Sequence, residues 1–232
     1  MNIFILNTGR CGSTTFIKAC KHIHNFTSAH ESLAGKIGEE RFNYPLNHIE
    51  ADNRLSWFLG KLDYYYGDEA IYVHLKRDIN STASSFLRRY NSGIMEAYRT
   101  RIHIGVPDEI NSLSVALDYC NTVNSNIEFF LKDKSFKMNF SLENAKEDFK
   151  SFWHLIKAEG DLDAALSEFD AFHNSTKEIE EKKKERDRKK WKEIEEKKKE
   201  RDRKKWNFQG INRSKQKLSR IARKLPSFIK NA

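Results

Sequence analysis

Cysteine and proline are scarce in this chain of 232 residues, and it contains no long hydrophobic run. The three cysteines, Cys11, Cys20 and Cys120, are few and odd in number, so reduced thiols are expected rather than a disulfide framework. Ten glycines and three prolines exclude a collagen-like or low-complexity composition. No apolar run approaches the ~20 residues that a membrane-spanning helix needs, so no membrane span is expected. The first residues lack the basic and long apolar segments of a secretory leader, which predicts a cytoplasmic protein.

The net charge of +9 is distributed unevenly along the chain. Residues 177–206 consist of one 15-residue segment repeated twice, with eight basic and five acidic side chains in each copy. Residues 207–232 hold seven basic and no acidic residues, whereas residues 1–176 hold 19 basic and 23 acidic ones. Because the positive charge belongs to an appendage of a mildly acidic body, nucleic-acid binding is not expected. We predict a globular domain over 1–176, a charged helical repeat over 177–206 and a basic tail over 207–232.

The repeat has the pattern of a solvated helix. Several of its glutamates precede a lysine by four residues, as in Glu185 and Lys189, and each such pair stabilises a helix by ~0.2–0.5 kcal/mol. Four large apolar side chains are too few for the seam of a coiled coil. They are Ile179, Trp191, Ile194 and Trp206. A charged helix exposed on most sides is the expected structure, and the alternative is a contact with a protein partner or an anionic surface.

Two strand-to-helix units near the N-terminus indicate an α/β fold. Ile3–Leu6 is a continuous apolar run, typical of a strand buried on both faces of a parallel sheet, and a glycine-containing loop and an amphipathic helix follow it. A second possible strand covers 25–28, and a clearer one covers 70–75, with Asn80 as the expected N-cap of the next helix. This alternation predicts a three-layer structure, a parallel sheet flanked by helices. Later elements are a possible strand at 136–140 and helices near 113–130, 149–156 and 162–169.

A loop of small and hydroxyl-bearing residues follows the first predicted strand and opens the first helix. Backbone N–H groups and the helix dipole converge there, and small residues let a phosphate or sulfate approach closely. Arg10 adds a fixed cation, whereas no lysine precedes Ser13 or Thr14 to grip the β- and γ-phosphates of ATP. The sequence therefore favours an anion site and disfavours ATP hydrolysis, although two glycines in a turn need no ligand. The loop residues are Thr8, Gly9, Arg10, Cys11, Gly12, Ser13, Thr14 and Thr15.

A second basic element follows the strand predicted at 70–75. Arg77 comes directly after this strand, and Ser85 lies eight residues later in the predicted helix. In an open parallel sheet ligands gather at the carboxyl ends of the strands, where Arg10 and Arg77 would both lie. A ligand with two anionic groups would satisfy both arginines.

These motifs resemble those of the sulfotransferases that use 3′-phosphoadenosine 5′-phosphosulfate (PAPS). In that family a G-R/K-x-G-[ST]-[ST] loop after the first strand holds the 5′-phosphosulfate, and residues 9–14 match it. An Arg at the end of a later strand, with a Ser eight positions on, holds the 3′-phosphate, and Arg77 and Ser85 have that spacing. Residues 29–32 follow the possible second strand, where bacterial members similar to this one place an acidic general base. The resemblance spans roughly residues 1–175.

The resemblance implies a P-loop-like α/β fold and transfer of a sulfuryl group from PAPS to a hydroxyl or amine of an unknown acceptor, a small molecule or a carbohydrate. In this interpretation Arg10 neutralises the charge that develops on the bridging oxygen. Glu31 takes the acceptor proton, with His30 as the rival base. The chemistry requires no metal. The PAPS-binding residues would be Gly9, Arg10, Cys11, Gly12, Ser13, Thr14, Thr15, Arg77 and Ser85.

Two features depart from the family pattern. Cys11 stands where many members have Ser, and no Arg-Lys-Gly loop for the adenosine end is recognisable near the C-terminus, although 210–213 offers a possible replacement. Two alternatives therefore stay open. One is a small-molecule or nucleotide kinase with a degenerate phosphate loop, and the other is a non-catalytic adaptor that acts through its charged helix.

Overall fold

A computed structural model describes residues 1–107 and 109–170, with scattered positions between 185 and 199. The chain divides into two compact units, Met1–His173 and Asn174–Ala232, and each is considered by itself. In the described part, no helix has both the length and the apolar character needed to cross a bilayer.

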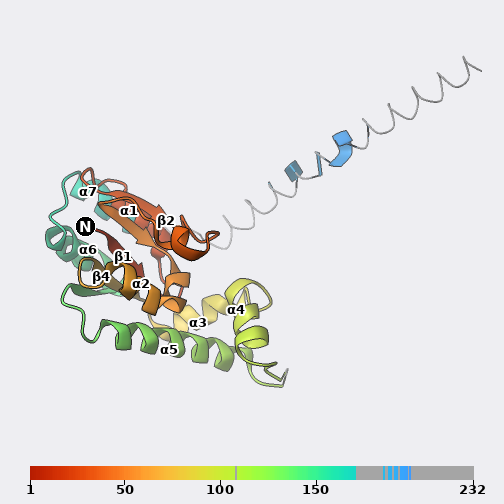
Figure 1. Ribbon diagram of the computed structural model, residues 1–232. Coiled ribbons are helices and arrows are strands. Elements are labelled where there is room, and N and C mark those ends of the chain that lie inside the picture. Colours follow the sequence, from red (N-terminus) through yellow and green to blue (C-terminus); the bar gives the residue numbers. More distant parts are fainter. Residues whose placement is uncertain are drawn as a thin grey trace, which may run out of the picture. The chain divides into compact units, whose positions relative to one another are not determined.

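The first unit is built on a five-stranded sheet in which all strands are parallel (Figure 1). The spatial order is β2-β3-β1-β4-β5, so β1 lies at the centre and β2 and β5 form the edges. This confirms the α/β class and the parallel sheet flanked by helices. The strands are β1 (Ile3–Leu6), β2 (Thr27–His30), β3 (His48–Ala51), β4 (Ile71–Lys76) and β5 (Lys137–Ser141).

The central strand is apolar on both faces because helices cover both sides of the sheet. All four residues of β1 are fully buried. Ile3 and Ile5 pack into one hydrophobic cluster, whereas Phe4 and Leu6 pack into another on the opposite face. This alternation follows from the two-residue period of a strand, and it explains why β1 is a continuous apolar run.

Three helices pack against the face that carries Ile3 and Ile5 (Figure 1). The aromatic core of this layer is a group of edge-to-face rings around Phe16, which contacts Phe140, Phe149 and Phe152 at centroid distances of 4.9–5.5 Å. The helices of this layer are α1 (Ser13–Cys20), α6 (Ala145–Leu155) and α7 (Leu162–Ser167).

The helices of the opposite layer come from the middle part of the chain, between residues 59 and 131. Tyr119 of the long helix α5 packs edge-to-face against Phe86 and Tyr98, and these rings join α5 to α3 and to the segment after α4. This layer contains α2 (Leu59–Tyr66), α3 (Ile79–Leu87), α4 (Gly93–Ala97) and α5 (Ser112–Leu131). Short helical turns complete it at η1 (Gly38–Phe42), η2 (Asn53–Trp57) and the π-helical η3 (Tyr98–Ile102), and η4 (Leu142–Asn144) and η5 (Glu168–Asp170) lie later in the chain.

The structure corrects the sequence prediction at three places. The expected strand at 25–28 begins two residues later, as β2, and β3 was not predicted at all. The N-cap of α3 is Asp78 rather than Asn80: an Asp78 carboxylate oxygen accepts a hydrogen bond from the Ser81 N–H at 2.8 Å. Asn80 therefore lies inside the first turn of the helix.

The second unit is described only at scattered positions. Those positions between 185 and 199 are helical, and two of the expected four-residue ion pairs are present. Glu185 contacts Lys189 at 2.9 Å, and Glu195 contacts Lys199 at 3.1 Å. The rest of the predicted charged helix, the basic tail and the 210–213 segment lie outside the described residues.

Candidate functional site

The loop between β1 and α1 adopts a backbone that depends on its glycines. Gly9, Arg10 and Gly12 all have positive φ values, of 83°, 62° and 91°. Side chains are rarely tolerated in this region, and a Cβ added to Gly12 would lie only 2.6 Å from the Leu142 side chain. The backbone conformation therefore favours glycine at position 12, and any larger residue would also displace the Leu142 side chain; this residue directly precedes α1.

A buried asparagine holds the loop on the end of the central strand. The Asn7 side chain donates to the Ile5 carbonyl at 2.9 Å and accepts from the Gly9 N–H at 2.8 Å. From the opposite direction, the Tyr119 hydroxyl of α5 donates to the Thr8 carbonyl at 2.8 Å. These bonds use the Gly9 N–H and the Thr8 carbonyl, so they fix the start of the loop. They do not involve the backbone of residues 10–12 or the first turn of α1, where an anion could bind.

The structure brings Arg10, Arg77 and Ser85 together. The Arg10 Nε–H donates to the Ser85 hydroxyl oxygen at 3.0 Å, across 75 residues of sequence. An Arg77 terminal nitrogen lies 3.4 Å from the Arg10 carbonyl oxygen, to which it donates. The loop after β1 and the helix after β4 therefore meet at the same end of the sheet, where the strands have their carboxyl ends. A single doubly anionic ligand would require this arrangement.

Two further arginines belong to the same cluster, and sequence reasoning missed them. Arg88 donates to the Ser85 hydroxyl at 3.5 Å. Burial lowers the pKa of Arg10, and the charges of Arg89, Arg88 and Arg77, in that order, lower it further. We call these four arginines and Ser85 the arginine cluster. The available signal for Arg88 and Arg89 was their spacing of three and four residues from Ser85, the spacing that brings side chains together in a helix.

Acidic side chains near the arginine cluster are engaged elsewhere. Within residues 1–107 and 109–170, no carboxylate forms an ion pair within 4 Å of these four guanidinium groups. Hydrogen bonds from Ser81 lower the pKa of Asp78, to which Arg77 adds a smaller contribution. Glu143 accepts hydrogen bonds from the Asp78 N–H at 2.8 Å and from the Ser141 hydroxyl at 2.7 Å. The charge of Arg77 also adds, behind burial and hydrogen bonding, to the causes that shift the pKa of Glu143. Asp78 and Glu143 thus offset part of the charge of Arg77, and the cluster keeps an excess of positive charge with no direct ion pair in the described residues.

The two candidate bases lie at the end of β2, His30 as its last residue and Glu31 directly after it, and they have different surroundings. The His30 Nε2 is 3.0 Å from the hydroxyl oxygen of Ser13, the first residue of α1. The Glu31 carboxylate, about one-third exposed, pairs with Arg54 at 2.9 Å. Glu31 also has a positive φ of 54°, so the chain turns sharply after the strand. Of the two candidate bases, His30 therefore contacts the start of α1 directly, whereas Glu31 contacts Arg54.

The remaining loop side chains divide into buried and accessible ones. Cys11 is fully buried, and burial raises the pKa of its thiol to about 12, which makes it a poor nucleophile. Thr15 is also buried, at 8% exposure, whereas Ser13 and Thr14 are partly exposed. Of the three consecutive hydroxyls, Ser13 and Thr14 are thus the accessible ones.

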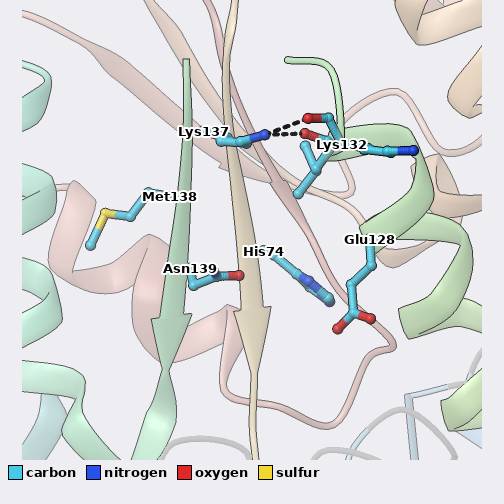
Figure 2. Close-up of a pocket in the computed structure, with 7 residues that line it drawn as sticks. His74, Glu128, Lys132, Lys137, Met138 and Asn139 are labelled. Atoms are coloured by element: carbon cyan, nitrogen blue, oxygen red, sulfur yellow. Dashed lines mark hydrogen bonds between the residues drawn. The ribbon is translucent and has the colours of Figure 1, made fainter. Parts of the chain in front are cut away.

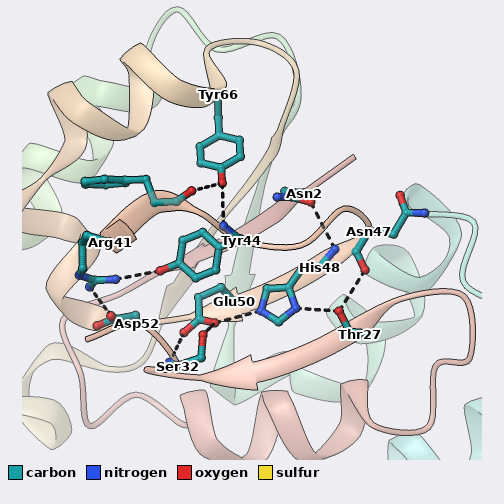
Figure 3. Close-up of polar contacts among 11 residues, drawn as sticks. Asn2, Thr27, Ser32, Arg41, Tyr44, Asn47, His48, Glu50, Asp52 and Tyr66 are labelled. Carbon is teal, nitrogen blue, oxygen red and sulfur yellow. Dashed lines mark hydrogen bonds and ion pairs between the residues drawn. The ribbon is translucent and has the colours of Figure 1, made fainter. Parts of the chain in front are cut away.

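A buried polar network supports the turn that follows β2 (Figure 3). The Glu50 carboxylate accepts hydrogen bonds from the Ser32 N–H at 2.8 Å and from its hydroxyl at 2.6 Å. His48 bridges Glu50, at 3.0 Å, to the Thr27 hydroxyl, at 2.8 Å. Glu50 is fully buried, and its bonds to Ser32 hold the chain beside the candidate bases.

Next to this network lies a buried ion pair between Arg41 and Asp52, which Figure 3 also shows. The Tyr44 hydroxyl accepts a second bond from Arg41 at 2.8 Å, and the Arg54 N–H donates to Asp52 at 2.8 Å. Burial nevertheless raises the pKa of Asp52, against the lowering effects of the Arg54 N–H and of Arg41. Every charge here has a partner inside the protein, and we call Thr27, Ser32, Arg41, Tyr44, His48, Glu50 and Asp52 the paired network.

A separate pocket of about 220 Å³ lies between β4, β5 and α5 (Figure 2). Its buried member, His74, contacts the Asn124 side chain at 3.1 Å through Nε2, whereas its Nδ1 has no hydrogen-bond partner in the structure. Burial lowers the pKa of His74 to about 4. Lys137 of this pocket donates to two main-chain carbonyls, those of Leu131 and Lys132, at 2.7 Å each. The pocket therefore offers a neutral imidazole and few free charges.

No group of three or more His, Cys, Asp or Glu side chains suited to a metal ion occurs among the residues that the structure describes. In comparisons with known proteins, no family model matches this chain, and no curated protein matches it significantly.

Proposed function

We propose that this protein is a sulfotransferase that transfers a sulfuryl group from PAPS to a hydroxyl or amine of an acceptor. The observation that carries this proposal is the 3.0 Å contact between Arg10 and Ser85, reinforced by the contact of Arg77 with the Arg10 carbonyl. These contacts join the loop after β1 to the helix after β4. Two anion-binding elements at the carboxyl ends of neighbouring strands suit a nucleotide with a charged group at each end.

The strand order supports a P-loop-like version of the α/β fold in this proposal. The glycine-containing loop follows the central strand β1 and leads directly into α1. This arrangement places the positive end of a helix and its unpaired N–H groups at the middle of the ligand-binding edge. We assign the 5′-phosphosulfate to the loop and helix start over 9–15, where the accessible side chains are those of Ser13 and Thr14.

Arg10 connects the two ends of the proposed nucleotide site. Its backbone belongs to the loop, while its side chain lies against Ser85 in α3. Arg77 and Ser85 would hold the 3′-phosphate, since guanidinium groups bind phosphate through paired, charge-assisted hydrogen bonds. During transfer the bond from sulfur to the phosphate oxygen breaks, and Arg10 would offset the charge that develops on that oxygen.

The acceptor oxygen or nitrogen forms the new bond to sulfur and loses its proton to a protein base. We assign this role to His30, because its imidazole contacts Ser13 at the start of α1. When Nε2 donates to Ser13, Nδ1 carries the lone pair that takes the proton. Glu31, paired with Arg54, would then help to position the acceptor. The released product is adenosine 3′,5′-bisphosphate.

Ligand binding tests this proposal before the acceptor is known. The melting temperature of the full chain is measured with adenosine 3′,5′-bisphosphate, AMP and magnesium-ATP, because stabilisation follows affinity. The proposal expects the bisphosphate to stabilise most, with the effect abolished in Arg77→Ala and retained in Arg101→Ala, an exposed control. Preferential stabilisation by magnesium-ATP, with hydrolysis, would instead identify the kinase alternative.

Transfer of labelled sulfate from PAPS to a panel of hydroxyl- and amine-bearing small molecules and carbohydrates then tests the reaction. His30→Asn is expected to lower kcat by about 10²–10⁴-fold, the usual contribution of a general base, with little change in bisphosphate affinity. Glu31→Gln is expected to change mainly KM for the acceptor. The reverse pattern would assign the base to Glu31.

A further inference from the structure

The arginine cluster contains more positive charge than the sequence motifs alone indicate. We propose that Arg88 and Arg89 act with Arg10 and Arg77 to bind a phosphate monoester in its dianionic form, and that they set the preference of the site for a 3′-phosphorylated nucleotide. This inference rests on the proposed function and adds two specificity-determining residues to it.

Hydrogen-bond geometry around Ser85 gives the first argument. Arg10 and Arg88 both donate to the Ser85 hydroxyl oxygen, at 3.0 and 3.5 Å. A serine hydroxyl has two acceptor lone pairs and one O–H donor, so these contacts occupy the lone pairs and leave the donor. Ser85 is 4% exposed, and within the described part of the chain its O–H has no hydrogen-bond acceptor. An anionic oxygen is the acceptor that this arrangement lacks.

Charge balance gives the second argument. Arg41 and Arg54 each contact a carboxylate, whereas no arginine of the cluster does so within the described residues. Mutual repulsion and the partial burial of Arg10 disfavour this arrangement, and a bound anion would relieve both. A phosphate monoester carries about −1.5 to −2 charges at pH 7, whereas a sulfate ester or phosphodiester carries only one. The cluster therefore favours the monoester.

Position along the helix gives the third argument. Arg88, the C-cap of α3, follows Ser85 by three residues, and Arg89 follows it by four in the turn after the helix. Both arginines are exposed, and neither holds a helix or strand in place. Their substitution is therefore expected to leave the fold intact.

The test compares two ligands that differ only in the 3′-phosphate. Dissociation constants for adenosine 3′,5′-bisphosphate and AMP are measured by calorimetry on the full chain, for the wild type and for Arg88→Gln/Arg89→Gln. The double variant is expected to bind the bisphosphate about 100-fold more weakly, at about tenfold for each positive charge removed, and AMP within about threefold of the wild type. The charge-matched control is Lys61→Gln/Arg101→Gln, which removes two exposed cations elsewhere.

The outcomes separate this inference from the proposed function. Equal weakening of AMP and the bisphosphate, or the same effect in the control, would reduce Arg88 and Arg89 to a general electrostatic contribution and overturn the inference. Unchanged bisphosphate affinity in the double variant, together with its loss in Arg77→Gln, would overturn the inference and leave the proposed function standing. Failure of the wild type to bind the bisphosphate would reject both.

Discussion

Charged side chains are concentrated in two regions, the paired network around β2 and β3 and the arginine cluster around the end of α3. The two regions balance charge differently. In the paired network, Arg41 meets Asp52 and His48 meets Glu50, and each group is at most 5% exposed. In the arginine cluster, Arg10 and Arg88 share the Ser85 hydroxyl and Arg77 contacts the Arg10 carbonyl, and none of the four guanidinium groups pairs with a carboxylate in the described residues. Internal balance indicates a structural role, and imbalance at a strand end indicates a ligand.

Removing one partner of the buried ion pair should have the largest effect on stability. Asp52→Ala leaves the Arg41 charge buried without its partner, and a loss of about 3–5 kcal/mol in the free energy of unfolding is expected. Urea denaturation measures this loss. The control is Arg41→Met/Asp52→Leu, which should recover most of the stability, because burial already raises the pKa of Asp52 and the pair is costly to desolvate. A loss below about 1 kcal/mol in Asp52→Ala would contradict a structural role.

His74 sharpens the comparison because it is buried, polar and uncharged. Burial lowers its pKa to about 4 in the folded protein, below the value of about 6.5 in the unfolded chain. Between these values the unfolded state binds a proton that the folded state does not, so stability falls as pH is lowered from 6.5 to 4. The expected contribution is about 3 kcal/mol at most.

The measurement is the free energy of unfolding against pH for the wild type and for His74→Gln, which cannot titrate. The difference between the two curves isolates His74 from the carboxylates that titrate in the same range. Parallel curves from pH 7 to pH 4 would show that His74 makes no such contribution.

Removing one charge from the arginine cluster should have opposite effects on binding and on stability. Arg10→Gln is expected to weaken binding of adenosine 3′,5′-bisphosphate by about 100-fold, or about 2.7 kcal/mol. The melting temperature without ligand should stay the same or rise, because desolvation and neighbouring arginines already lower the pKa of Arg10. Calorimetry and thermal unfolding give the two values, and a clear drop in melting temperature would place Arg10 with the structural charges instead.

The smallest effect is expected from the uncharged member of the arginine cluster. Ser85→Ala removes one hydrogen-bond donor to the ligand and should weaken bisphosphate binding by about 0.5–1.5 kcal/mol. Ser84→Ala is the matched control, because Ser84 precedes it on the same helix and is exposed. Equal affinities of the two variants would remove Ser85 from the site.

The central strands were predictable because burial on both faces leaves an apolar run. β1 has the predicted bounds, and β4 and β5 lie within one residue of theirs. β3 was missed because its sequence, His-Ile-Glu-Ala, carries two ionisable residues. Both are buried, and they are tolerated only because Thr27 and Ser32, distant in sequence, complete their hydrogen bonds. A local pattern contains no information about such partners.

The candidate site was partly predictable for a similar reason. The loop after β1 and the pair of Arg77 and Ser85 follow recognisable spacings, and the structure places them in contact through Arg10. Arg88 and Arg89 belong to no such motif, and their spacing from Ser85 is a weak signal because an Arg-Arg pair at the end of a helix is usually a solvated surface feature. Their relation to Arg10 depends on how the end of α3 meets the loop after β1, which only the folded chain defines.

The anchoring of the glycine loop has a consequence for the order of folding. Every residue of this loop lies within the first dozen positions, yet Tyr119 bonds to Thr8 and Leu142 packs against Gly12. During synthesis the loop leaves the ribosome early but lacks these contacts until more than half of the chain has followed. A truncated N-terminal fragment would contain all glycines of the loop but would lack the contacts from Tyr119 and Leu142 that fix the conformation of the loop. The loop therefore acquires its proposed ability to bind an anion late, when the last strand and the turn that follows it are in place.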